Sequence, residues 1–184
     1  MADECSRRRH RARRSGSGYD RAHGAHGPRS HMVFVMKLAG KDGQSLELRI
    51  LGYQFPHLAT MPYDSNWLIV AGNVTHARGS WQFTDPCLLT YEAAALASWM
   101  DRLAEADRFS SICDFMEPSL EFRALVEMDR PVLRVTFDYG ALPSWAADER
   151  GAEEQIWIDF AIEELDLRLL AQQWRAELAK YPPR

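Results

Sequence analysis

The sequence lacks the residue patterns of most metal and cofactor sites. Its 3 cysteines, Cys5, Cys87 and Cys113, are an odd number at unrelated spacings, which indicates neither a disulfide framework nor a zinc site. It also has no His-x-x-x-His pair, no calcium-binding loop and no glycine-rich phosphate loop. We therefore expect no metal and no cofactor.

Long apolar runs are missing as well. The longest, such as the run from Trp67 to Gly72, fall far short of the ~18 residues that cross a bilayer. The first residues are basic and have no apolar region of the kind found in a secretory signal. These absences predict a cytoplasmic protein that does not enter a membrane.

Groups able to catalyse a reaction at neutral pH are scarce. Beyond residue 31 the only histidines are His57 and His76, both in expected loops or turns. His76, Asp85 and Cys87 share one stretch without the spacing of a nucleophilic triad, and Cys87 and Cys113 are typical of small buried apolar residues. We expect no catalytic residue, with an enzyme that uses Cys87 or His76 in a cleft between sheet and helices as the first alternative.

Charge is distributed unevenly along the chain. Residues 1–31 hold 8 of the 22 Lys and Arg and 3 of the 26 Asp and Glu, so residues 32–184 hold 14 and 23, a formal charge of −9. The basic segment lacks large aliphatic side chains and is expected to be a disordered tail, either a nucleic-acid-binding arm or a dispensable leader before a start at Met32. A nucleic-acid-associated protein tethered by this tail is the second alternative. The acidic body repels nucleic acid and favours a basic protein partner.

Residues 32–184 are expected to form one α+β domain, since 46% of the chain is hydrophobic. Alternating apolar and polar side chains predict strands near residues 33–38, 46–50, 67–74, 81–85, 120–126, 133–139 and 156–162. Pro86 is expected to end the fourth strand, because proline has no amide donor. Helical spacing predicts two amphipathic helices, one from an N-cap at Thr90 to about Asp107 and one capped by Asp166. Short turns between strands predict an antiparallel, twisted sheet of about seven strands packed against both helices.

Two tryptophans and an acidic segment are the candidate partner-binding residues. Trp157 alternates out of phase with the apolar Ile156 and Ile158, and Trp145 lies in an expected loop, so both are candidates for exposed anchors. Adjacent carboxylates in a loop do not form an acid/base dyad, but an acidic rim accelerates association with a basic protein. The predicted contacts are Trp145, Asp148, Glu149, Glu153, Glu154 and Trp157.

Several segments resemble the WapI-type bacterial immunity proteins, small cytosolic domains that protect a cell from a toxin delivered by contact. These segments are residues 51–56, 63–68, 85–88, 117–122 and 181–184, together with Trp81 and Trp99. The resemblance begins near residue 46, with Ser119 where the family has Asn and no counterpart to the residues before Met32. It implies a protein that binds and neutralises a cognate toxin. A body at −9 without catalytic groups fits a stoichiometric inhibitor of a basic nuclease toxin, and this is the function we expect.

Overall fold

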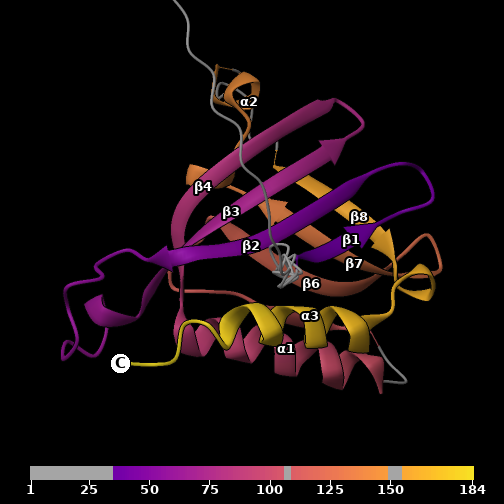
Figure 1. Ribbon diagram of the computed structural model, residues 1–184. Coiled ribbons are helices and arrows are strands. Elements are labelled where there is room, and N and C mark those ends of the chain that lie inside the picture. The colour runs from indigo at the N-terminus through magenta and orange to yellow at the C-terminus, as the bar shows by residue number, and fades with distance from the viewer. Residues whose placement is uncertain (1–34, 106–108, 149–154) are drawn as a thin grey trace, which may run out of the picture. The chain divides into compact units, whose positions relative to one another are not determined.

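The computed structural model describes residues 35–105, 109–148 and 155–184, without the side chains of Ala147 and Asp148. These residues lie within one unit, Val33–Arg184. They form eight strands in two four-stranded antiparallel sheets, with two main helices (Figure 1). The expected α+β class and antiparallel pairing are confirmed, but the strands divide between two sheets instead of forming one.

The first sheet has the order β1-β2-β3-β4. Its strands are β1 (Met36–Ala39), β2 (Ser45–Tyr53), β3 (Trp67–His76) and β4 (Gly79–Leu89). The predicted first hairpin and the central position of β3 are confirmed, because β3 pairs with both β2 and β4. Gly43 turns the first hairpin at a φ of 85°, a conformation that glycine adopts without strain.

The prediction that Pro86 ends its strand is wrong, because β4 continues to Leu89. Two features accommodate the proline. β4 is at the edge of its sheet, and the register shifts between the pairs Leu68–Leu88 and Val70–Asp85, so two residues of β4 lie opposite one residue of β3. A missing amide is tolerated at such a bulge on an edge strand.

The second sheet has the order β5-β6-β7-β8. Its strands are β5 (Ser111–Cys113), β6 (Leu120–Glu127), β7 (Arg130–Phe137) and β8 (Ile156–Ala161). Met128 and Asp129 turn the predicted second hairpin with φ values of 47° and 62°, a backbone that matches the twist of the strands. Strand β5 was not predicted, because three residues are too few to show an alternation.

The two main helices are α1 (Thr90–Ala104) and α3 (Leu167–Leu178), which lie side by side below both sheets in Figure 1. Asp166 caps α3 as predicted, since its side chain accepts a hydrogen bond from the Leu169 amide at 2.9 Å. Thr90 is not the N-cap of α1. It is the first helical residue, and the Leu89 amide donates instead to Glu92 Oε2 at 2.8 Å.

Each sheet buries its inner face against the other sheet and against the helices. Phe137 of β7 contacts both Trp81 and Phe83 of β4, with ring centroids 5.2 and 6.3 Å apart. At the helical side, Trp174 is fully buried and its Nε1 donates to the Ala93 carbonyl at 2.8 Å. Alternation in a sequence shows that one face of a strand is buried, but it does not show which layer covers that face, and so the division into two sheets was missed.

Four short helical segments connect these elements. They are η1 (Asp64–Asn66), η2 (Tyr139–Ala141), α2 (Ser144–Asp148) and η3 (Ile162–Glu164). Trp145 therefore lies on a short helix and not in the expected loop. No helix in the described part of the chain is long and apolar enough to cross a membrane.

Candidate partner-binding surface

Neither Cys87 nor Cys113 lies in a position where its thiol could act as a nucleophile. Cys87 is fully buried, and burial together with the charge of Asp85 raises the pKa of its thiol. Burial likewise raises the pKa of Cys113 to about 11. His76 is not their partner, because it pairs with Gly79, eight residues or about 26 Å from Cys87 along β4. Both thiols are free, and they stay protonated at neutral pH.

This burial predicts how the thiols react. In a Cys5→Ser variant, we expect iodoacetamide at pH 7.5 to leave Cys87 and Cys113 unlabelled until urea unfolds the protein, as read by intact mass. A Met128→Cys variant is the positive control, because that position is 90% exposed and its thiol should react at once. Rapid labelling of Cys87 in the folded protein would contradict the burial described here.

Metal binding has no support among the described residues, where no group of three or more His, Cys, Asp or Glu side chains could hold an ion. Depressions lie on the outer faces of both sheets.

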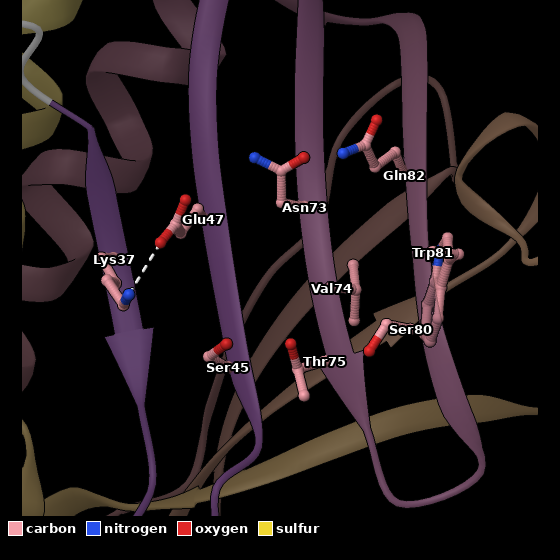
Figure 2. A pocket seen from close by; sticks show the side chains of 9 residues that line it. All are labelled: Lys37, Ser45, Glu47, Asn73, Val74, Thr75, Ser80, Trp81 and Gln82. Atoms are coloured by element: carbon pink, nitrogen blue, oxygen red, sulfur yellow. Dashed lines mark ion pairs between the residues drawn. The ribbon is translucent and has the colours of Figure 1, made fainter.

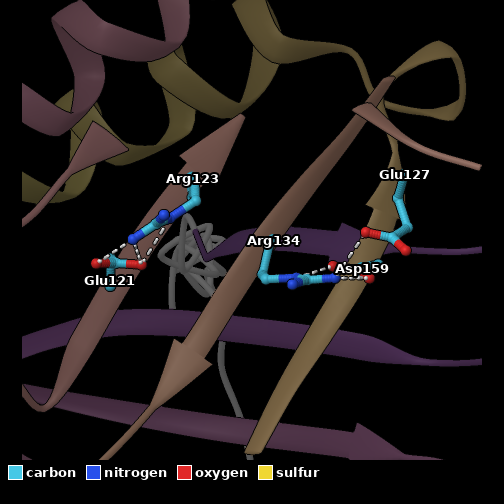
Figure 3. Close-up of polar contacts among 5 residues, drawn as sticks. All are labelled: Glu121, Arg123, Glu127, Arg134 and Asp159. Carbon is cyan, nitrogen blue, oxygen red and sulfur yellow. Dashed lines mark hydrogen bonds and ion pairs between the residues drawn. The ribbon is translucent and has the colours of Figure 1, made fainter. Parts of the chain in front are cut away.

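Trp157 lies on the outer face of β8 and is 39% exposed, so the predicted phase of this strand is confirmed. The guanidinium carbon of Arg134, on the neighbouring β7, lies 4.8 Å from the centroid of the Trp157 ring. Asp159 holds this guanidinium, because Arg134 Nε and Nη2 donate to its two carboxylate oxygens at 2.7 Å each (Figure 3). Glu127 adds an ion pair at 3.5 Å, and the hydrogen bond to Asp159 raises the pKa of Arg134.

Trp145 is half-buried on α2. It lies against Trp81 of β4 and against Arg78 of the turn between β3 and β4. Its ring centroid is 6.1 Å from that of Trp81 and 4.5 Å from the guanidinium carbon of Arg78. Its Nε1 is buried without a hydrogen-bond partner among the described residues. Trp145 therefore offers a partner less surface than the exposed position expected from a loop.

The turn between β3 and β4 brings the two predicted tryptophans together. A depression of about 320 Å³ is lined by His76, Arg78 and Trp157, and Arg78 also contacts Trp145. The Arg78 amide donates to His76 Nδ1 at 3.1 Å, and burial and the charge of Arg78 lower the pKa of the imidazole. The acidic part of the predicted site, Glu149, Glu153, Glu154 and the side chain of Asp148, lies outside the described residues.

A second depression, of about 510 Å³, lies on the outer face of the first sheet (Figure 2). The strand register aligns Lys37, Glu47, Asn73 and Gln82 in one row across all four strands. Lys37 Nζ lies 2.7 Å from Glu47 Oε1, and its hydrogen bond lowers the pKa of Glu47. In the sequence these residues are visible only as the polar positions of alternating strands. Their alignment in one row depends on the strand register, which the sequence does not show. The row offers hydrogen bonds but no exposed apolar anchor, which makes it a weaker candidate for protein binding.

The segments that carry the family resemblance fasten the fold instead of forming an open site. Asn66, in segment 63–68, is 4% exposed and joins this segment to segment 181–184 and to the start of α1. Its Nδ2 donates to the carbonyls of Pro62 and Arg184 at 2.8 and 2.9 Å. Its Oδ1 accepts from Thr90 Oγ1 and from the Arg184 amide, both at 2.9 Å.

A second cluster lies where β4 meets the second sheet. Ser119 Oγ donates to Asp85 Oδ2 at 2.7 Å, so the serine that replaces the expected asparagine still bonds to the Asp-Pro segment. Gly140 leaves room for this carboxylate, because a Cβ at that position would lie 2.1 Å from Asp85 Oδ1.

Comparison with known families gives one match. A protein-family model described as the immunity protein WapI-like family matches residues 37–182. No curated protein and no solved structure matches the chain. The matched range includes both hydrogen-bond clusters except Arg184, both sheets except the first residue of β1, and both main helices.

Proposed function

We propose that the toxin neutralised by this protein is a basic nuclease. The chain belongs to the WapI-like immunity protein family, and membership implies that it neutralises a cognate toxin. The protein inhibits it stoichiometrically, by covering its active site or its substrate groove. Immunity proteins of this family are not enzymes, so the alternative of a catalyst using Cys87 or His76 is excluded.

One observation carries the choice of binding surface, namely the exposed Trp157 beside an Arg134 guanidinium that is already fixed. Tryptophan and arginine are the residues most often found at the energetic centres of protein interfaces. Here Asp159 and Glu127 hold the arginine in the free protein, so little conformational freedom remains to be lost on binding. Trp145 and the acidic segment 148–154 extend this surface in our proposal.

The charge of the body supports a basic partner. A nuclease binds a polyanion and needs a positive groove, and a body with a formal charge of −9 is attracted to such a groove through long-range fields. Acidic rim residues act chiefly on the association rate and on its salt dependence. Association with the toxin should therefore slow as salt is added.

The test uses the C-terminal toxic domain encoded beside this protein. We expect co-expression to restore growth, and a titration to end inhibition of nucleic-acid cleavage at one protein per toxin. Trp157→Ala should weaken the complex by at least about 2 kcal/mol, roughly 30-fold in Kd, as measured by calorimetry.

The matched control is Leu169→Ala. It also removes an exposed apolar side chain, but from α3 instead of β8, and should leave Kd unchanged. A toxin that binds but cleaves no nucleic acid would refute the nuclease assignment. Equal affinities of the Trp157→Ala variant and the unmodified protein would refute the binding surface.

A further inference from the structure

An exposed apolar patch lies at the start of α1, away from the two tryptophans of the proposed site. Three large side chains form what we call the α1 patch: Tyr63 is 57% exposed, Tyr91 48% and Met116 56%. The Met116 amide donates to Glu92 Oε1 at 2.8 Å, which fixes this residue against the first turn of α1. Tyr63 is joined to the same turn through Asn66, whose amide donates to the Tyr63 carbonyl and whose Oδ1 accepts from Thr90 Oγ1, both at 2.9 Å.

The surroundings of the α1 patch are acidic. Asp64 follows Tyr63, Glu92 follows Tyr91 and Glu117 follows Met116, so each apolar side chain has a carboxylate beside it in the sequence. Asp64 and Glu117 are exposed. A second copy of this chain would bring the same carboxylates together, whereas a basic partner would neutralise them.

A groove of about 440 Å³ on the outer face of the second sheet lies between residues next to Met116 in the sequence and residues next to Trp157 in the sheet. Phe115 and Pro118, which flank Met116 and Glu117, line one end of it. Arg134 and Thr136 line the other end, where Arg134 covers the Trp157 ring and Thr136 is the cross-strand partner of Trp157. Between them Arg123 is held by Glu121 through hydrogen bonds of 3.1 and 3.2 Å (Figure 3).

The dimensions suit a single protein partner. The groove is lined by the loop after β5, which carries Met116, and by β6 and β7, while Trp157 lies on the next strand, β8. The three strand spacings from β5 to β8 amount to about 14 Å. An interface of standard size covers about 800 Å² on each partner and is roughly 30 Å across. Trp157 and the α1 patch therefore fit within one footprint.

We infer that the cognate toxin contacts this protein at two anchors, Trp157 at one end of the groove and the α1 patch at the other. The inference rests on the proposed function and adds a second contact region to it. Basic side chains of the toxin meet Asp64 and Glu117, while its apolar side chains cover Tyr91 and Met116. Large aromatic and methionine side chains are enriched in such interfaces.

The experiment is calorimetry with the toxic domain encoded beside this protein, at fixed salt. We expect the double variant Tyr91→Ser, Met116→Ser to bind at least tenfold more weakly than the unmodified protein. Glu92 keeps its hydrogen bonds in this variant, because the Leu89 and Met116 amides that donate to it belong to the backbone. An unchanged Tm would show that the variant is folded.

Leu169→Ser is the control for a general loss of apolar surface and should bind as the unmodified protein does. If the double variant binds with unchanged affinity while Trp157→Ala is weakened, the second anchor is wrong and the proposed function stands. If the unmodified protein does not bind the toxin, both fail.

Discussion

Replacing Asn66 by alanine should lower the free energy of unfolding by about 3 to 5 kcal/mol, because four hydrogen bonds are lost at a buried position. The substitution leaves the Pro62 carbonyl, the Thr90 hydroxyl and both backbone groups of Arg184 without this partner. It should also weaken the attachment of Arg184 to the loop before β3, where the guanidinium still donates to the Pro56 and Leu58 carbonyls. Urea denaturation followed by tryptophan fluorescence would measure the change.

Asn73→Ala is the matched control for this experiment. Asn73 is exposed in the outer row of the first sheet, and its loss should change the free energy of unfolding by less than about 0.5 kcal/mol. Asn66→Asp places a carboxylate oxygen against the Pro62 and Arg184 carbonyls at a buried position, so it should be at least as destabilising as Asn66→Ala. Equal stability of the two alanine variants would show that the Asn66 network does not hold the fold together.

Gly72→Ala should be nearly as damaging, at about 3 kcal/mol, because there is no space for a side chain at this point of β3. A Cβ on Gly72 would lie 2.1 Å from Cε1 of Phe83, the residue directly opposite on β4. The ring cannot move freely, since it also contacts Phe137 across the core. Thermal unfolding would show the loss as a fall in Tm.

Two further variants separate a steric clash from a loss of backbone flexibility. Gly52→Ala on β2 meets nothing within 4 Å and should have little effect. Phe83→Leu alone should be destabilising, yet in the double variant with Gly72→Ala it should recover part of the lost stability by removing the ring. Additive losses in the double variant would mean that the clash with Phe83 is not the cause.

Local patterns predicted much of this fold. Alternation placed Trp157 on the opposite face from Ile156 and Ile158, and the Asp166 cap follows from a short acceptor side chain before a helical stripe. These features depend on neighbours in the sequence, which are visible without a structure.

Features that depend on distant partners were predicted less well. Thr90 has the side chain of an N-cap, but its hydroxyl donates to Asn66, 24 residues earlier in the chain. Pro86 should end a strand, but a bulge set by the pairing with β3 absorbs it.

The candidate site shows the same division. The outward position of Trp157 was predicted from its phase. The fixed position of Arg134 was not predicted, because it depends on Asp159, 25 residues away on the next strand. The signal that could have revealed it was a pair of opposite charges on the outward phase of two predicted strands. The α1 patch had no such signal, since Tyr63, Tyr91 and Met116 come from three separate segments.

The hydrogen bonds from Arg134 to Asp159 affect the expected lifetime of the proposed complex with the toxin. An arginine that must find its rotamer on contact gives back that entropy whenever the partner leaves, which favours dissociation. An arginine fixed beforehand has none to recover, so its contribution appears mainly as a slower off-rate. In the complex that we propose, a long residence time would keep the toxin neutralised.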